Sequence, residues 1–249
     1  MNTCPKIADY TYPTAEPEVD KLFQKARALQ KQEEAKPFED HDHSEIVRLY
    51  TLAAEKSHWK AMNNLALLYE AGYYIPEDEK KALALFKKME EMGIPEGYIN
   101  LASAHEDGLA GLSTNPKQIK KYLIKAAEIG HPRAQFLYGK ELLYPETIKE
   151  AKKWLDCALQ QDYDDAAFYL AILEENDGAE DAALQYYRRG AMLGSSMCLG
   201  ELSLIYRQGK YGTKIDNTRS QCYFELDNKL DEDPSLTFPD LDEICPPSK

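Results

Sequence analysis

The sequence predicts an all-α fold, a right-handed α-solenoid built from helix-turn-helix repeats. Three observations predict it: turn residues at nearly constant spacing, a small residue at one place in each first helix, and large residues followed by small ones in each second helix. The turn residues that end successive second helices are Ser57, Gly93, Gly130, Asp162 and Gly194. Their spacings of 36, 37, 32 and 32 residues match one helix pair per unit.

The first helix of each unit follows a fixed order of residue sizes. Eight positions after each turn residue lies an apolar or aromatic residue, and the next position is always small. These small residues are Ala66, Ala102, Gly139, Ala171 and Ser203. Because residues spaced by about 3.6 positions share one helix face, we expect the small side chains to let the partner helix approach closely.

The second helix carries large residues near its middle and mostly small ones near its end. The large pairs are Leu49 with Tyr50, Leu85 with Phe86, Tyr122 with Leu123, Trp154 with Leu155, and Tyr186 with Tyr187. This shape suits a helix wedged between its own partner and the next unit. The pattern predicts an N-terminal extension (1–16), a repeat array (17–230) and an acidic, proline-containing tail (231–249). The units of the array are 17–57, 58–93, 94–130, 131–162, 163–194 and 195–230.

Composition excludes several function classes. The formal net charge of −13 argues against a nucleic-acid partner, and no apolar run approaches the roughly 18 residues of a membrane span. The sequence contains no nucleophile elbow, phosphate loop or dinucleotide fingerprint, which indicates a protein that is not an enzyme and needs no cofactor. The "DHDH" segment (40–43) is interpreted as a solvated loop rather than a metal site, because its spacing does not complete a ligand set.

The clearest unit is "AMNNLALLYEAGYYIPEDEKKALALFKKMEEMG" (61–93), and it resembles the Sel1-like repeat, a relative of the tetratricopeptide repeat. Weaker copies begin at residues 97, 134, 166 and 198, and a degenerate first unit precedes them. The resemblance implies a binding solenoid whose first helices line a concave face. By analogy with tetratricopeptide arrays, the partner-binding positions on that face are Asn63, Leu67, Glu70, Ile99, Ser103, Glu106, Phe136, Lys140, Tyr144, Phe168, Ile172, Glu175, Leu204 and Arg207.

Apolar members of this set would form the centre of the binding face. Ile99, Phe136, Phe168 and Ile172 would be rimmed by acidic side chains such as Glu106 and Glu175. The alternative is that the register is shifted by one position and these apolar side chains pack in the core, since apolar residues at helical spacing are usually core residues.

Five cysteines leave the redox compartment open. Cys198 and Cys222 lie on the two helices of the last pair, so a disulfide between them is expected, with Cys245 in the tail as a rival partner. Cys157 lies in a core-like helix and is expected to stay free. A disulfide would indicate an oxidising compartment, whereas buried thiols would also suit the cytoplasm.

The end of the array with the tail "NKLDEDPSLTFPDLDEICPPSK" (228–249) is similar to a group of Gram-negative Sel1-like proteins found beside type VI secretion phospholipase effectors. The resemblance implies a periplasmic immunity protein that binds the toxin and blocks it sterically, with a basic surface on the toxin side. Proteins of that group usually begin with a lipoprotein signal and continue beyond this point; this sequence has neither feature. The alternative function is a generic Sel1-like adaptor for protein complexes, with a cytoplasmic location as the alternative compartment.

Overall fold

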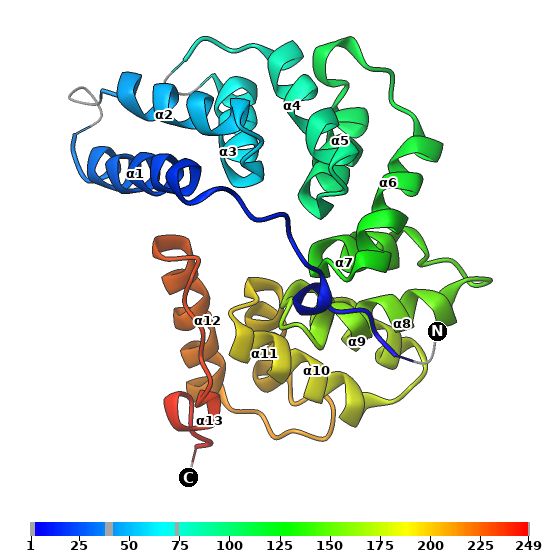
Figure 1. Cartoon of the computed structure of the whole chain (residues 1–249). Helices are drawn as coiled ribbons and strands as arrows, with labels where there is room; N and C mark the ends of the chain where they lie inside the picture. Colours follow the sequence, from blue (N-terminus) through cyan, green and yellow to red (C-terminus); the bar gives the residue numbers. More distant parts are fainter. Residues whose placement is uncertain (1–2, 38–41, 73–74, 249) are drawn as a thin grey trace. The chain divides into compact units, whose positions relative to one another are not determined.

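The computed structural model describes residues 3–37, 42–72 and 75–248, and every regular element in these ranges is a helix (Figure 1). The chain divides into two compact units. The N-terminal unit spans Ala8–Ile129, and the C-terminal unit spans Gly130–Lys249 together with Met1–Ile7. The predicted all-α class is confirmed.

The N-terminal unit is a succession of packed helices. Each helix contacts the one before it and the one after it along the chain. The helices are α1 (Pro17–Glu34), α2 (Ser44–Glu55), α3 (Trp59–Ala71), α4 (Glu79–Glu91), α5 (Pro95–Asp107) and α6 (Pro116–Ile129), with the 3-10 helix η3 (Leu109–Gly111) after α5. The 3-10 helix η1 (Ile7–Asp9) includes the last residue of the N-terminal segment assigned to the C-terminal unit and the first residues of this one.

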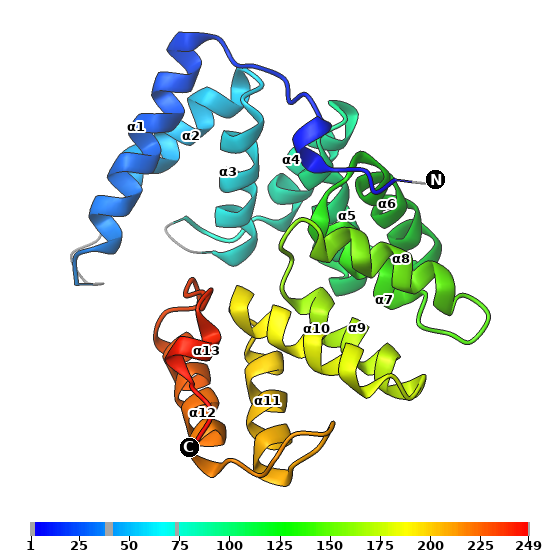
Figure 2. The same ribbon diagram turned by 90° about the horizontal axis from the view of Figure 1, so that it is seen from below.

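The C-terminal unit continues the same scheme. From α7 to α12, successive helices pack in order (Figure 2). The α9 helix also contacts α7 and α11, which are the neighbouring first helices, and α13 contacts α10. The helices are α7 (Pro132–Glu141), α8 (Ile148–Leu159), α9 (Asp165–Asn176), α10 (Glu180–Leu193), α11 (Ser196–Gln208), α12 (Asn217–Glu232) and the short α13 (Leu241–Ile244).

The turn residues that define the repeat share one backbone conformation. Their φ angles are 62° at Ser57, 76° at Gly93, 106° at Gly130, 59° at Asp162 and 95° at Gly194. A left-handed residue cannot continue a right-handed helix, so it ends the second helix and turns the chain into the next unit. The sequence spacing therefore marks a repeated conformation.

Small residues allow close helix contact, as the sequence predicted. Ala66, Ala102 and Ala171 are buried. Gly139 on α7 lies so close to α8 that a Cβ atom there would sit 3.0 Å from Cγ of Leu155. A larger side chain at Gly139 would force these two helices apart.

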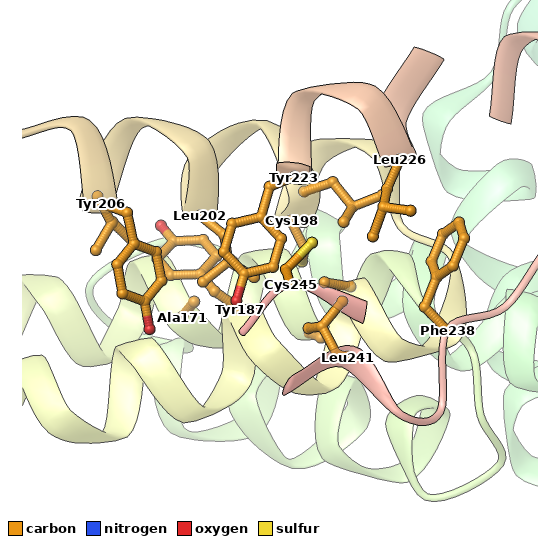
Figure 3. Packing of buried hydrophobic residues seen from close by; sticks show 14 of the residues in the cluster. Ala171, Tyr187, Cys198, Leu202, Tyr206, Tyr223, Leu226, Phe238, Leu241 and Cys245 are labelled. Carbon is orange, nitrogen blue, oxygen red and sulfur yellow. The ribbon is translucent and has the colours of Figure 1, made fainter. Parts of the chain in front are cut away.

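The C-terminal tail folds back onto the last helix pair. Phe238, Leu241 and Cys245 are buried in the same cluster as Tyr223 and Leu226 of α12 (Figure 3). The last repeat of a solenoid has no following unit to cover its apolar face. In this protein the tail supplies that cover.

Polar contacts fix the tail in place. The backbone N–H of Phe238 donates to the carbonyl oxygen of Met192 at 2.8 Å. Asp242 forms ion pairs with Arg188 on α10 and with the buried Arg219 on α12. The guanidinium of Arg219 also lies 4.5 Å from the ring centroid of Tyr206, a cation–π geometry. The tail is thus bound by apolar burial and by charge.

The first described residues belong to the C-terminal unit. The side-chain amide of Gln135 donates to the carbonyl oxygen of Pro5 at 2.8 Å, and the backbone N–H of Ile7 donates to Oε1 of Gln161 at 2.9 Å. A Cβ atom on Gly130 would lie 2.4 Å from the carbonyl carbon of Lys6. Only glycine leaves room for this segment to pass so closely.

The predicted disulfide pattern is wrong. The structure pairs Cys222 with Cys245, the rival that the sequence left open, and Cys4 with Cys157, which was expected to stay free. Cys198 is the free, buried thiol of the described residues. It cannot reach Cys222 because its Sγ lies against α10, where a Cβ atom on Gly190 would be only 2.3 Å away.

Thiol labelling provides a direct check of this pairing. Native protein kept free of reductant should label at no cysteine, because Cys198 is buried and its burial raises the pKa of the thiol to about 12. After denaturation without reductant, maleimide should label Cys198 alone, and after reduction all five cysteines. Peptide mapping that recovered a Cys198–Cys222 peptide would contradict the structure.

Candidate partner-binding face

In the N-terminal unit, the predicted face residues differ in exposure. Leu67 on α3 is 44% exposed and Glu106 on α5 is exposed, so both are accessible to a partner. Asn63 is partly buried, and its Oδ1 accepts a hydrogen bond from Nδ2 of Asn100 at 2.8 Å. Ile99 is only 3% exposed and belongs to the core, so its prediction as a surface residue is wrong.

Glu70 and Ser103 complete the predicted set in this unit, and both are partly buried. Burial raises the pKa of the Glu70 carboxyl, and the nearby carboxylates of Asp107 and Glu79 raise it further. Three acidic groups therefore gather at the ends of α3 and α5 and the start of α4.

In the C-terminal unit, the expected aromatic centre is mostly internal. Phe136 is 5% exposed and packs its ring against Tyr163 and Tyr169, at centroid distances of 4.9 and 5.6 Å. Its prediction as a surface residue is wrong, because α9 covers this side of α7. Phe168 is partly buried between Tyr169 and Tyr187.

Other predicted positions in this unit reach the surface. Tyr144 is 63% exposed and Arg207 is exposed, whereas Ile172 and Leu204 are partly buried. The Lys140 ammonium lies over the rings of Phe136 and Tyr169, 5.2 and 5.1 Å from their centroids. This lysine is thus held by cation–π contacts within its own unit.

Glu175 serves an internal hydrogen-bond network. It accepts hydrogen bonds from the hydroxyl groups of Tyr187, at 2.7 Å, and Tyr211. Burial raises the pKa of both tyrosines, and the hydrogen bonds to the Glu175 carboxylate raise it further. Both hydroxyls therefore stay protonated donors. Glu175 ties the loop after α11 to α9.

Replacement of Tyr211 by phenylalanine should lower the free energy of unfolding by about 1 kcal/mol, because Glu175 loses one of two donors. The midpoint of urea unfolding measures this change. Tyr144→Phe is the matched control, since its side chain is exposed and should change the free energy by less than about 0.5 kcal/mol. Equal effects of the two variants would contradict a structural role for the Glu175 network.

A cavity of about 470 Å³ lies beside Asn63 in the N-terminal unit. It is formed by α1, α3 and the start of α5, and its lining residues are Phe23, Gln24, Arg27, Trp59, Lys60, Asn63, Asn64 and Glu96. Only Asn63 of this set is among the predicted face residues. The repeat pattern does not single out the other lining residues, because their types are not kept from repeat to repeat. For example, Pro95 and Glu96 of the next repeat occupy the positions of Trp59 and Lys60.

A second cavity of about 630 Å³ shares Trp59 and Lys60 with the first. Its wall includes the segment before α1, where the Tyr12 ring stacks on Trp59 at a centroid distance of 4.5 Å. His58 also borders it: Nδ1 accepts from the backbone N–H of Ala61, and Nε2 lies 3.3 Å from Oδ1 of Asp20. Assignment by these partners puts the histidine proton on Nε2, so His58 donates to Asp20.

Glu96 is the acidic group in the wall of the smaller cavity. Its Oε1 accepts from the hydroxyl of Tyr12 at 2.9 Å, and its Oε2 is buried without a hydrogen-bond partner. Burial raises the pKa of the Glu96 carboxyl, whereas the Tyr12 hydrogen bond and the Lys60 charge oppose the rise. The carboxyl is therefore less fully ionised than an exposed glutamate.

No group of three or more His, Cys, Asp or Glu side chains among the residues that the structure describes could hold a metal ion; in the "DHDH" segment, Asp40 and His41 lie outside the described residues. No helix in residues 3–37, 42–72 and 75–248 combines the length and apolar character that a membrane crossing needs.

Comparison with known proteins relates these features to a family. Residues 59–94, 95–131 and 164–195 each match the Sel1 repeat. Two solved structures of immunity proteins from Pseudomonas aeruginosa are similar over almost the full chain. PA5088 is 28% identical with a TM-score of 0.74, covering 99% of this chain and 94% of that one. Pa5087 is 29% identical with a TM-score of 0.69, covering 98% and 93%.

A curated relative is an exopolysaccharide production negative regulator from Rhizobium leguminosarum bv. viciae, 26% identical over 168 residues. The match covers 60% of this chain and 63% of that protein, so the chain spans less than two thirds of this relative's length. These comparisons confirm the predicted α-solenoid of Sel1-type helix pairs.

Proposed function

Because the chain carries Sel1 repeats and matches two solved immunity proteins over almost its whole length, we propose that it is a protein-binding solenoid that acts as an immunity protein. The single observation behind this proposal is the similarity at 28–29% identity over 98–99% of the chain. The finer part of the proposal names the toxin as an antibacterial phospholipase of type VI secretion. It rests on the sequence resemblance of the last helix pair and tail to that group.

The proposed mechanism is steric occlusion, which requires no chemistry from the inhibitor. Bound protein would cover the entrance of the toxin's active site or the face that docks on a membrane. The formal charge of −13 favours a toxin with a basic surface, since opposite charges accelerate the encounter. Well-packed apolar contacts at the centre of the interface would then slow dissociation.

We assign partner contact to the exposed members of the predicted face. These are Leu67 and Glu106 in the N-terminal unit, and Tyr144 and Arg207 in the C-terminal unit. Ile99 and Phe136 are left out because they are buried. Leu67 and Tyr144 are large apolar or aromatic side chains that gain most when a partner covers them.

We propose a periplasmic location on the basis of the disulfides. Two bridges, Cys4–Cys157 and Cys222–Cys245, form in this structure. Disulfides persist in oxidising compartments such as the bacterial periplasm and are rare in the cytoplasm. A chain that functioned in the cytoplasm would keep these four cysteines reduced.

The experiment pairs the purified protein with a type VI secretion phospholipase, sought among the products of the genes beside its own. Binding is measured by calorimetry, and lipase activity is followed on phospholipid vesicles with and without the protein. We expect tight binding and loss of activity at equimolar protein. Binding without inhibition would favour the generic adaptor instead, and absence of both would refute the immunity role.

Variants locate the interface in the same assay. Leu67→Ala and Tyr144→Ala should each weaken lipase binding roughly tenfold, as truncation of a central apolar contact does. Ile215→Ala is the matched control, because Ile215 is 66% exposed but lies in the loop before α12, outside the predicted face. Weakening by Ile215→Ala alone would place the interface elsewhere.

A further inference from the structure

The cavity of about 470 Å³ between α1, α3 and α5 carries an excess of hydrogen-bond donors in an acidic protein. Arg27 and Lys60 both line it, and both side chains belong to exposed residues. A guanidinium and an ammonium only donate hydrogen bonds. The local charge of this wall is thus opposite to that of the whole chain.

Neutral groups in the wall add to the donors. Asn63 accepts from Asn100 through its Oδ1, which leaves the N–H groups of its amide to donate. Gln24 is exposed at the rim and contributes a second amide. Asn64 is used internally, since its Nδ2 donates to the Tyr50 hydroxyl at 3.1 Å.

The acidic group that faces these donors, Glu96, is engaged through one of its two oxygens. Glu96 accepts the Tyr12 hydroxyl, and its other oxygen is buried within the wall. The nearby Lys60 charge opposes the rise in the Glu96 pKa that burial causes, so the ammonium offsets part of the Glu96 charge. In the adjoining cavity, Asp20 is paired with His58. Neither carboxylate neutralises Arg27.

Apolar surfaces complete the cavity. Phe23 and Trp59 form part of the wall, and the Lys60 ammonium lies 5.4 Å from the centroid of the Trp59 ring. A short aliphatic chain could pack on these rings while its polar end reached Arg27 and Lys60. Arginine with a carboxylate is also the strongest common type of side-chain ion pair, because two parallel hydrogen bonds can form.

We propose that this cavity receives the side chain of a glutamate or aspartate presented by the protein partner. The carboxylate would be bound by Arg27 and Lys60, with the Asn63 amide as a third donor. The identity of the partner rests on the proposed function above, whereas the chemistry of the cavity does not. In this contact the partner supplies the acidic group and this chain the basic ones. In the rest of the interface we expect the opposite, a basic partner surface against acidic residues of this chain.

The cavity can be tested without the partner, by NMR titration of the whole chain. The probe is N-acetyl-glutamate methylamide, and N-acetyl-lysine methylamide is the comparison at equal ionic strength. We expect saturable shifts of the Trp59 indole and Asn63 amide signals with the glutamate probe only. These shifts should disappear in the Arg27→Gln/Lys60→Gln double variant and persist in Lys87→Gln, an exposed lysine on α4.

Three results of this titration would overturn the proposal: no saturable shift with the glutamate probe, an equal response to the lysine probe, or an unchanged response in the double variant. The thermal midpoint of each variant is measured in parallel. An unchanged midpoint shows that any loss of response comes from the missing charges and not from unfolding.

A second arm uses the phospholipase of the binding assay above and separates the two proposals. If the lipase binds the wild type, the Arg27→Gln/Lys60→Gln variant should bind at least tenfold more weakly, and Lys87→Gln equally well. Equal binding of the double variant would overturn the cavity proposal and leave the immunity role standing. If the wild type does not bind the lipase, the immunity role fails. The NMR titration alone then tests whether the cavity binds a carboxylate side chain.

Discussion

Replacing Asp242 with alanine should lower the free energy of unfolding of the C-terminal unit by about 3 kcal/mol, because a buried arginine then loses its carboxylate. The Arg219 side chain is 6% exposed and pairs with Asp242 of the tail. Its Nε also donates to the neutral Tyr223 hydroxyl, at 3.0 Å. Asp242 itself is 56% exposed, so the expected cost stands at the lower end of the range for buried pairs. Urea unfolding followed by tyrosine fluorescence measures the change.

Two further variants test whether the pair itself is responsible. Asp242→Asn keeps a hydrogen-bond acceptor but loses the charge, and we expect an intermediate cost. Asp231→Ala removes an exposed aspartate at the end of α12 and should change the free energy by less than about 0.5 kcal/mol. If Asp242→Ala and Asp231→Ala lower the free energy of unfolding equally, the Arg219 guanidinium does not need the Asp242 carboxylate of the tail as its counter-charge.

Local features of this fold could be predicted from the sequence because they depend on near neighbours. The positive φ at Gly93 and Asp162 follows from the need to end one helix and begin the next within a few residues. The close contact at Gly139 follows from residue size at a fixed helical position. The spacing of the turn residues and the order of residue sizes are both periodic in the sequence. The predicted turns and the predicted close helix contact are both confirmed.

Exposure was harder to predict, because it depends on which neighbouring helix covers a side chain. Ile99 and Phe136 lie two positions before the apolar residue of their helices, whereas Leu67 lies two positions after it and Tyr144 about one turn later. All four were predicted for one face, yet the former pair is buried and the latter pair is exposed. Phe136 is covered by Tyr163 and Tyr169 from the next unit. The aromatic side chains of the following repeat (163–194) are long enough to reach Phe136 on α7, and the repeat register alone does not show this.

Contacts distant in sequence were the hardest to predict, and the Cys222–Cys245 bridge was foreseen only as an alternative. The partner of Cys157 is 153 residues away, in a segment that no repeat pattern describes. The partner of Cys222 lies in the tail, which folds back because the last helix pair would otherwise leave Tyr223 and Leu226 uncovered. The donor-rich cavity could not be predicted for a similar reason, since Arg27 and Lys60 come from different repeats (17–57 and 58–93) and neither occupies a position that the repeat pattern singles out.

Replacing Gly194 with alanine should destabilise the C-terminal unit by about 3 kcal/mol, the sum of two separate costs. Gly194 has a φ of 95°, a conformation that costs a residue with a Cβ atom roughly 1–2 kcal/mol. A Cβ atom there would also lie 2.3 Å from the carbonyl oxygen of Leu236, so the tail must shift, at a further cost of about 1–3 kcal/mol. The midpoint of urea unfolding measures the total.

Gly212→Ala separates the two costs. Gly212 has a φ of 67°, but no atom lies within 4 Å of the added Cβ, so only the conformational cost of roughly 1–2 kcal/mol applies. Hydrogen exchange gives a local readout, because the N–H of Phe238 is bonded to the carbonyl of Met192, two residues before Gly194. If the tail packs as described, Gly194→Ala should accelerate exchange at Phe238 and Gly212→Ala should not. Equal destabilisation by both variants, with exchange at Phe238 unchanged, would mean that the tail does not rest on the turn at Gly194.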